Sequence, residues 1–345
     1  MSLNEIGLST RIIGPQQPPF VVAELGYNFN SLEEALASVE AAAEAGVDAI
    51  KLQTFRAETL TTRTIAFPAE AGGTNQYEEF KRYEIDEETH RAIFARARQL
   101  GLIPFSTPSH PDDVELLERV GVELYKIGSD DLTNLPFLAY VAGTGKPIIL
   151  SSGMATLEEV EQAIRVLQEA GARQLVLLQC VSNYPVKDPL LLNLRVIEAY
   201  RKRFQVLVGY SDHSTTPWAA VAAVALGAVV IERHFALSKT LPAPDAFFSA
   251  DPKEMAELVR AVRETYAMLG DGRKAPVPTE LQMRAETRKG LVARRRIVKG
   301  RPLAPQDVMI KRPATGILPH EYDRAIGRIA KRDIDADEVI TWEMV

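Results

Sequence analysis

Apolar runs of five or six residues recur along the chain, and helical patterns lie between them. Eight such runs can be counted, at residues 20–25, 49–54, 103–107, 124–128, 147–152, 175–180, 206–211 and 229–234. The intervening segments, such as SLEEALASVEAAAEAG, place apolar residues at helical spacing and end on glycine. Eight alternating units predict a closed parallel (β/α)8 barrel of the TIM type. An open doubly wound sheet is the alternative, and it too binds ligands at the carboxyl ends of its strands.

The last part of the chain follows a different pattern. The turn-rich stretch LGDGRKAPVP at 269–278 ends the last helical pattern, so we expect a barrel domain over residues 1–280 and a second domain over residues 281–345. Within the second domain, ARRRIVKGRPLAPQDV at 293–308 is echoed by AKRDIDADEVITWEMV at 330–345. Strand-like alternation in both copies predicts a small, pseudo-symmetric, β-rich domain.

Charge is divided unevenly between these two parts. The net charge is -6, yet residues 285–345 carry 13 Lys and Arg against 9 Asp and Glu, which leaves the barrel part at about -10. The run from Arg294 to Arg296 has few aromatic neighbours, so a solvated face or an anion contact is favoured over nucleic acid. No apolar stretch reaches the length of about 20 residues that spans a bilayer, and MSLNEIGLSTR lacks the apolar core of a signal peptide. We therefore expect a cytoplasmic protein that binds neither nucleic acid nor membrane.

Polar side chains stand at the C-terminal ends of several runs, where barrels of this type keep their chemistry. Lys51 and Gln53 are two residues apart on one strand and so project the same way, while Lys126 lies in the fourth run. Hydroxyl residues follow at other strand ends, namely Thr107, Ser129, Ser151 and Ser211. Two lysines and several hydroxyls from different strands predict a cradle for a phosphate group. For each lysine alone, an ion pair with a buried carboxylate is the alternative.

Two histidines, His213 and His234, end the seventh and eighth runs, which are neighbours in a barrel. They predict a two-histidine site for a divalent metal that is completed by water and substrate oxygens and acts as a Lewis acid on a carbonyl. A satisfied hydrogen-bonding role is the alternative for each histidine. Glu24 ends the first run and is a candidate general base or partner of a sugar hydroxyl. Asp245, on a Pro-rich loop, is predicted either to bind substrate hydroxyls or to cap a turn.

The other histidines, His90, His110 and His320, show no comparable pairing, and we expect them on the surface. The only cysteine, Cys180, ends an apolar run. We expect it to be a small buried side chain rather than a nucleophile.

The motifs AELGYN, KLQTF, FSTP, YKIGSDD, ILSSGM, GYSDH and ERHF, in this order, resemble those of the sialic acid synthase family, which includes N-acetylneuraminate, legionaminate and pseudaminate synthases. The resemblance covers nearly the whole chain. KRPATGI and the repeat resemble the antifreeze-like (SAF, β-clip) domain that follows the TIM barrel in those synthases. The resemblance implies a transferase that condenses phosphoenolpyruvate with an open-chain N-acetylated hexose, releases phosphate and forms a nine-carbon 2-keto sugar acid.

Carried over motif by motif, the resemblance also implies roles for individual residues. The phosphate and carboxylate of phosphoenolpyruvate would be bound by Lys51, Thr107, Lys126, Ser129, Ser151 and Ser211. Glu24 would transfer a proton, and His213 with His234 would hold manganese or magnesium. Sugar-side or supporting positions would be Gln53, Asp131, Tyr184, Asp245 and Arg312. Arg312 matches an arginine that, in the family, reaches the active site of the partner subunit in a domain-swapped homodimer.

Departures from the family pattern lie on the sugar side. They are Phe29 and Ala246 in place of histidines, Ser182 in place of an asparagine and Asp131 in place of a glutamate. The acceptor is therefore open between N-acetylmannosamine, a diacetamido-trideoxy hexose and a spore-coat-type sugar. Two alternatives from other classes also stay open, a Schiff-base aldolase or lyase acting through Lys51 or Lys126 and a non-catalytic sugar-binding protein.

Overall fold

The computed structural model describes residues 5–67 and 73–345. Residues 1–4, part of the segment in which we expect no signal peptide, lie outside the described residues. The chain divides into two compact units, Met1–Gly270 and Asp271–Val345. This division falls shortly before residue 280, where the turn-rich stretch predicts the boundary.

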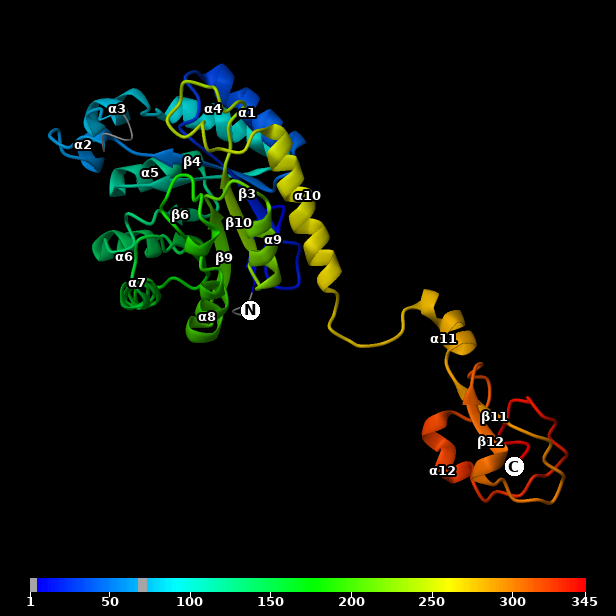
Figure 1. Cartoon of the computed structure of the whole chain (residues 1–345). Coiled ribbons are helices and arrows are strands. Elements are labelled where there is room, and N and C mark those ends of the chain that lie inside the picture. The colour runs from blue at the N-terminus through cyan, green and yellow to red at the C-terminus, as the bar shows by residue number, and fades with distance from the viewer. Residues whose placement is uncertain (1–4, 68–72) are drawn as a thin grey trace. The chain divides into compact units, whose positions relative to one another are not determined.

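The first unit is a closed barrel of eight parallel strands, which confirms the (β/α)8 prediction over the open sheet. The strands follow one another around the barrel in chain order, and the last pairs with the first (Figure 1). Each predicted apolar run forms one strand, within two residues at either end. The strands are β3 (Phe20–Gly26), β4 (Ala49–Thr54), β5 (Ile103–Pro108), β6 (Tyr125–Ile127), β7 (Ile148–Ser151), β8 (Leu175–Cys180), β9 (Leu207–Asp212) and β10 (Val230–His234).

Helices connect successive strands and surround the barrel (Figure 1). Two short helices, α2 and α3, lie in the long connection between β4 and α4. The described helices of this unit are α1 (Leu32–Glu44), α2 (Ala57–Leu60), α3 (Gln76–Arg82), α4 (Glu87–Gln99), α5 (Pro111–Val120), α6 (Leu135–Ala142), α7 (Leu157–Glu169), α8 (Arg195–Phe204), α9 (Trp218–Ala225) and α10 (Pro252–Leu269), together with the 3-10 turn η2 (Pro189–Leu191).

Helix α7 illustrates how the sequence specifies these elements. Thr156 accepts a hydrogen bond from the backbone N–H of Glu159, whose carboxylate accepts one from the backbone of Thr156 in return. This capping box satisfies two amide groups that the first turn leaves without helical partners. Val160, Ala163, Ile164 and Leu167, at helical spacing, form the buried face of the helix.

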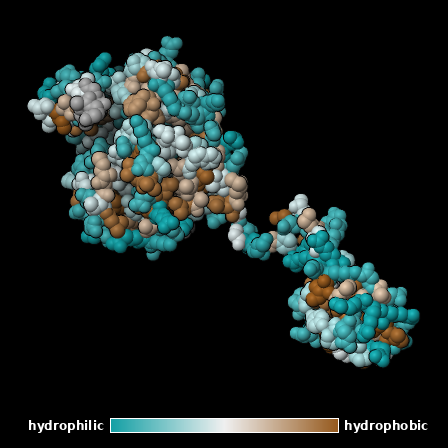
Figure 2. All heavy atoms as spheres, viewed as in Figure 1, coloured by the Kyte–Doolittle hydropathy of each residue, from teal (hydrophilic) through white to brown (hydrophobic). Residues whose placement is uncertain are grey.

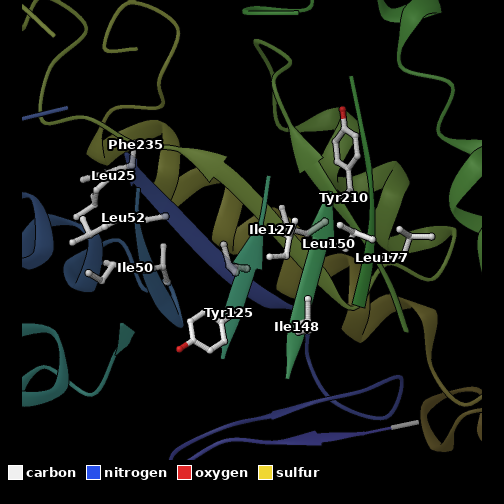
Figure 3. Close-up of a cluster of buried hydrophobic side chains, with 14 of the residues drawn as sticks. Leu25, Ile50, Leu52, Tyr125, Ile127, Ile148, Leu150, Leu177, Tyr210 and Phe235 are labelled. Atoms are coloured by element: carbon white, nitrogen blue, oxygen red, sulfur yellow. The ribbon is translucent and has the colours of Figure 1, made fainter. Parts of the chain in front are cut away.

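Alternation along the strands divides the core into two layers. In β3, Val21, Ala23 and Leu25 belong to the layer between barrel and helices, whereas Phe20 and Val22 fill the barrel interior. Figure 3 shows part of the outer layer, with Leu25 on β3, Ile50 and Leu52 on β4, Ile127 on β6, Leu150 on β7 and Leu177 on β8. The N-terminal hairpin of β1 (Ile6–Gly7) and β2 (Ile12–Ile13) adds Ile6 and Ile13 to the interior cluster. It packs there with the first residues of several strands, so the interior is filled at that end.

The second unit has a small hydrophobic core of its own. Strands β11 (Gly290–Ala293) and β12 (Val308–Lys311) pair antiparallel, alongside helices α11 (Leu281–Thr287) and α12 (Tyr322–Ala325) and the 3-10 turns η3 (Pro278–Glu280), η4 (Pro305–Asp307) and η5 (Pro319–Glu321). The two copies of the predicted repeat pair with each other. Ile297 and Ile334, which hold the same place in the two copies, exchange N–H···O bonds of 2.8 and 2.9 Å. The equivalent positions thus face each other, as pseudo-symmetry requires.

The visible surface of each unit is mainly hydrophilic, with hydrophobic residues in small groups (Figure 2). Among the residues that the structure describes, no helix is both long and apolar enough to cross a membrane.

Candidate active site

A cavity of about 1220 Å³ lies at the C-terminal ends of the barrel strands. Side chains from all eight strands, or from the residues directly after them, line it. Parallel strands end at the same face of a barrel, so residues far apart in the sequence meet there. The other end is filled by the hairpin, and this mouth is the place where polar groups gather.

The floor of the cavity carries two lysines and two carboxylates. Lys51 Nζ lies 2.7 Å from the Glu24 carboxylate and 3.0 Å from Thr107 Oγ1. Glu232 lies between the two lysines, 3.9 Å from Lys51 Nζ and 3.6 Å from Lys126 Nζ. All four charged side chains are buried. Buried charges of this kind require paired partners, and here they form one connected network.

This network pushes the pKa values of the two carboxylates in opposite directions. Burial raises the pKa of Glu24, and Lys51 opposes the rise only in part. Burial alone would also raise the pKa of Glu232, but the charges of Lys126 and Lys51 outweigh burial and lower the pKa of that carboxyl. Divergent pKa values in one site are typical of an acid and base with separate roles. Glu24 is therefore the carboxylate suited to exchange a proton, and Glu232 the one suited to remain charged.

The pKa values of the two lysines are also shifted in opposite directions. Burial tends to lower the pKa of Lys51, but Glu232 and Glu24 outweigh it and raise that pKa. For Lys126 burial prevails over Glu232, and its pKa is lowered. Lys51 is thus a fixed cation, whereas Lys126 depends on a bound anion or on Glu232 to stay protonated.

Hydroxyl groups surround the lysines at the strand ends. Ser129 Oγ accepts a hydrogen bond of 2.9 Å from the backbone N–H of Gly153. The buried Oγ atoms of Ser151 and Ser182 have no hydrogen-bond partner within residues 5–67 and 73–345. A buried polar atom without a partner costs free energy unless a ligand or water completes it. These hydroxyls beside Lys126 therefore fit a bound anion, as the sequence predicts for Ser129 and Ser151.

The two histidines at the ends of β9 and β10 face each other across the cavity, with ring centroids 5.4 Å apart. His213 Nδ1 lies 2.8 Å from the carbonyl oxygen of Val181. When that nitrogen donates its proton, Nε2 keeps a free lone pair, which is the usual arrangement of a metal-binding histidine. His234 Nδ1 has no hydrogen-bond partner in the described part of the chain and lies 3.4 Å from Asp245 Oδ2.

The environment keeps His234 neutral. Burial lowers its pKa well below the usual value, and the positive charges nearby add to the effect. Burial raises the pKa of Asp245 to about 7. Among the described residues no group of three or more His, Cys, Asp or Glu side chains is placed to hold a metal, and this includes His213, His234 and Asp245. A cation here would depend on two imidazoles and on oxygens from outside the chain.

Aromatic rings form the upper walls of the cavity. On one side Phe80 lies 5.3 Å from Phe55 and 5.7 Å from Phe67, measured between ring centroids. On the other side Tyr184 lies 5.3 Å from Phe248 and 4.2 Å from the His213 ring. Rings of this kind stack on the C–H faces of a ligand and contact methyl groups, so the cavity combines a charged floor with apolar walls.

Twelve of the predicted site residues line this cavity together. They are Glu24, Lys51, Gln53, Thr107, Lys126, Ser129, Ser151, Tyr184, Ser211, His213, His234 and Asp245. Asp131 does not line it, because its carboxylate accepts a hydrogen bond of 2.9 Å from Asn134, and the adjacent Asp130 faces the cavity instead. Arg312 belongs to the second unit, where it lies beside Lys289 and Lys311.

Sequence reasoning missed Glu232 and misplaced His90. Glu232 is two residues before His234 on the same strand, so strict alternation would have placed both in the cavity. His90 was expected on the surface, and that expectation is wrong. The ring is fully buried, with Nε2 2.8 Å from Thr54 Oγ1 and Nδ1 2.7 Å from the Asp86 carbonyl oxygen. Cys180 is buried as expected.

A closed (β/α)8 barrel with buried ionisable groups and unpaired hydroxyls at its C-terminal mouth defines an enzyme of the TIM-barrel class. The NeuB family model matches residues 38–274, and the SAF domain model matches residues 288–345. The chain belongs to the NeuB family and carries a C-terminal SAF domain.

Relatives of known activity extend over most of the chain. The N,N'-diacetyllegionaminic acid synthase of Legionella pneumophila is 38% identical, and the alignment covers 96% of both chains. The pseudaminic acid synthase of Campylobacter jejuni is 38% identical over 91% of this chain and 93% of its own. Among solved structures, the N-acetylneuraminic acid synthetase of Leptospira borgpetersenii in complex with citrate is 32% identical, with a TM-score of 0.74 over 81% of this chain and 95% of its own. The relatives support the general class of nonulosonic acid synthases.

Proposed function

We propose that this enzyme condenses phosphoenolpyruvate with an open-chain N-acetylated hexose to give a nine-carbon 2-keto sugar acid and phosphate. The observation that carries the proposal is the convergence of Lys51, Lys126 and unpaired hydroxyls with the His213–His234 pair in one cavity. The lysines and hydroxyls fit an anionic enol ester such as phosphoenolpyruvate, and the histidine pair fits the activation of a carbonyl group. The named activities of the relatives are consistent with this reaction.

In the proposed reaction the lysines and hydroxyls bind the phosphate and carboxylate of phosphoenolpyruvate. Ser151 Oγ gains the partner that it lacks, and the anion helps to keep Lys126 protonated. Carbon 3 of the enol attacks the aldehyde carbon of the sugar and forms the new C–C bond. Water adds to carbon 2, and the bond from carbon 2 to the phosphate oxygen breaks as phosphate leaves.

The proton transfers are assigned to Glu24. Its buried carboxyl has a raised pKa, and it lies next to Lys51 and accepts a hydrogen bond of 2.9 Å from Gln53. A carboxyl whose pKa is raised holds a proton more readily than an ordinary carboxyl, so it can both give and take one during turnover. It protonates the oxygen of the former aldehyde or accepts a proton from the attacking water.

A divalent cation, Mn²⁺ or Mg²⁺, fits the two histidines. Burial tends to lower the pKa of His213, but Cys180 and the Val181 carbonyl outweigh it and raise that pKa, so a cation would displace a proton from Nε2. The deprotonated Nε2 of His213 and the unpaired Nδ1 of His234 would then supply two nitrogen ligands, with Asp245 beside the second. Such a cation supplies Lewis acidity that polarises the sugar aldehyde. Without it, the two imidazoles and Asp245 would still orient the aldehyde end of the acceptor.

The apolar walls favour a diacetamido-trideoxy hexose over N-acetylmannosamine. Phe55, Phe67 and Phe80 offer rings to acetamido and ring methyl groups, but no donor or acceptor to a hydroxyl. A hydroxyl placed against one of these three rings loses its hydrogen bonds to water without replacement, whereas the phenols of Tyr27 and Tyr83 in the same wall can bond to one. The three phenylalanine rings are therefore the part of the cavity that suits the acetamido and methyl groups of an acceptor of the legionaminate or pseudaminate pathway class.

Phosphate release from phosphoenolpyruvate tests this proposal. The assay uses N-acetylmannosamine, its 6-phosphate and diacetamido-trideoxy hexoses, each with Mn²⁺ and with chelator. We expect chelator-sensitive release with a diacetamido-trideoxy sugar. His213→Ala should abolish it, whereas His110→Ala, at a partly exposed residue that caps α5 in the same unit, should not. Release that chelator leaves unchanged would contradict the metal assignment, and no release with any of these sugars would contradict the acceptor class.

A Schiff-base mechanism is the second candidate, because burial lowers the pKa of Lys126 and favours a nucleophilic amine. It predicts a covalent adduct on Lys126 after borohydride treatment in the presence of a keto acid, and turnover that resists chelator. Mass spectrometry of the intact chain distinguishes the two mechanisms. The domain-swapped homodimer, the reach of Arg312 and the cytoplasmic location stay predictions.

A further inference from the structure

A buried ion pair stands directly behind the two histidines. Asp212 lies between Ser211 and His213 at the end of β9, and Arg233 lies between Glu232 and His234 in β10. The two residues are partners in the register of the parallel strands. Because Ser211, His213, Glu232 and His234 line the cavity, alternation turns Asp212 and Arg233 to the other side of the barrel wall.

The pair is connected to the segment that follows His213. Arg233 Nη1 lies 2.8 Å from Asp212 Oδ2 and also donates a hydrogen bond of 3.0 Å to the carbonyl oxygen of Thr216. Asp212 Oδ1 accepts a hydrogen bond of 2.8 Å from the backbone N–H of Ser214. Ser214 Oγ donates to the same Thr216 carbonyl at 3.0 Å. One carboxylate and one guanidinium thus fix the backbone that directly follows His213.

The contacts also link the two histidine-bearing strands to each other. Asp212 precedes His213 by one residue, Arg233 precedes His234 by one residue, and both are buried with exposed fractions of 1% and 5%. Removing two charges from water is costly, and well-packed hydrophobic residues often give equal or greater stability at such places. Stability alone is therefore a weak explanation for a buried ion pair at this place. Two metal ligands held at a precise separation, by contrast, need directional contacts such as these.

We propose that Asp212 and Arg233 are positioning residues that set the separation and orientation of the His213 and His234 rings, and thereby the affinity of the site for a divalent cation. This inference rests on the metal site of the proposed function. The pair touches neither the cavity nor the reacting groups, so its influence passes through the backbone of β9, β10 and residues 213–216.

The chain offers a matched control at the opposite end of the barrel. Asp48, directly before β4, is also a buried carboxylate that accepts a backbone N–H, from Val21 at 2.9 Å. It pairs with two partly exposed arginines, Arg11 and Arg263, the second at 3.1 Å. Asp48→Asn therefore reports what the loss of a buried, paired carboxylate far from the mouth does to the fold alone.

The experiment measures Mn²⁺ binding to the full chain, by calorimetry and by the electron paramagnetic resonance signal of free Mn²⁺, with thermal unfolding recorded in parallel. Wild type should bind one Mn²⁺, and His213→Ala should lose this site. Asp212→Asn should bind Mn²⁺ about 10- to 100-fold more weakly, the range typical when an outer partner of a metal ligand is removed. Asp48→Asn should keep wild-type affinity for Mn²⁺ even if its melting temperature falls as far as that of Asp212→Asn.

Arg233→Lys provides a second variant if Asp212→Asn does not fold. Lysine keeps the charge but lacks the rigid planar guanidinium that holds Nη1 between Asp212 and the Thr216 carbonyl, so a smaller loss of Mn²⁺ affinity is expected. If wild type binds Mn²⁺ and the folded Asp212 and Arg233 variants bind it equally tightly, the positioning role is overturned but the proposed metal site is not. Wild type that binds no Mn²⁺ would overturn the proposed metal site, and the inference with it.

Discussion

Gly153→Ala should weaken the binding of phosphoenolpyruvate while leaving the fold intact. Gly153 follows β7 and donates its backbone N–H to Ser129 Oγ. A methyl group on its Cα would lie 2.8 Å from Ser129 Oγ and closer still to Ser182 Oγ, below the separation that Cβ atoms tolerate. The obstructing atoms are the ends of short side chains, so these rotate away and the backbone stays in place.

The magnitude follows from the hydrogen bonds at risk. A hydrogen bond to a charged group contributes about 1.5 to 3 kcal/mol, and each 1.4 kcal/mol is a factor of ten in affinity. Loss of one serine contact to the phosphate or carboxylate should therefore raise the dissociation constant of phosphoenolpyruvate about 10- to 150-fold. The acceptor sites at the aromatic walls are untouched.

Calorimetric titration of phosphoenolpyruvate in the absence of sugar measures this change directly. Gly7→Ala is the matched control, because nothing lies within 4 Å of its added methyl group and its backbone conformation is ordinary. A Gly153→Ala protein with wild-type melting temperature and unchanged affinity for phosphoenolpyruvate would refute the assignment of Ser129 to the anion cradle.

Three further outcomes are expected. Glu24→Gln should lower kcat about 100- to 10,000-fold in the phosphate-release assay with little change in the KM of phosphoenolpyruvate, and an unchanged kcat would remove Glu24 from the proton transfers. Burial lowers the pKa of His90 from 6.5, so the native state takes up fewer protons than the unfolded chain and loses stability as the pH falls below that value. The melting temperature of wild type should thus drop more between about pH 7.5 and pH 5.5 than that of His90→Gln, and equal drops would show that His90 does not contribute. Arg312→Ala should raise the KM of the acceptor about tenfold or more and spare that of phosphoenolpyruvate; identical acceptor saturation curves would contradict the domain-swapped contact.

The barrel could be predicted because its strands are buried on both faces. Such strands read as continuous apolar runs, and a charged residue inside one, such as Lys51 or Lys126, stands out at once. The same contrast found both histidines at the strand ends. The local sequence pattern was sufficient to predict a site residue wherever that residue lay in or directly after the apolar run of its own strand.

The misses have the opposite cause. The burial of His90 depends on Thr54, which comes from another segment and becomes its neighbour only in the folded barrel. Asp130 rather than Asp131 faces the cavity because the segment after β6 is not a strand, and the two-residue period that identifies inward positions ends with the strand. The aromatic walls are likewise assembled from separate connections, which no single window of sequence contains.

The reciprocal pairing of Ile297 with Ile334 in the SAF domain has a consequence for how that domain can diverge. Each copy of the repeat forms backbone hydrogen bonds with the other, so a change in one copy alters the surroundings of the equivalent residue in the other. Residues 309–311, after the first copy, belong to β12 and are held by their pairing with β11. Arg312 follows that strand directly and belongs to neither copy, so its side chain can change without altering the reciprocal contact between Ile297 and Ile334.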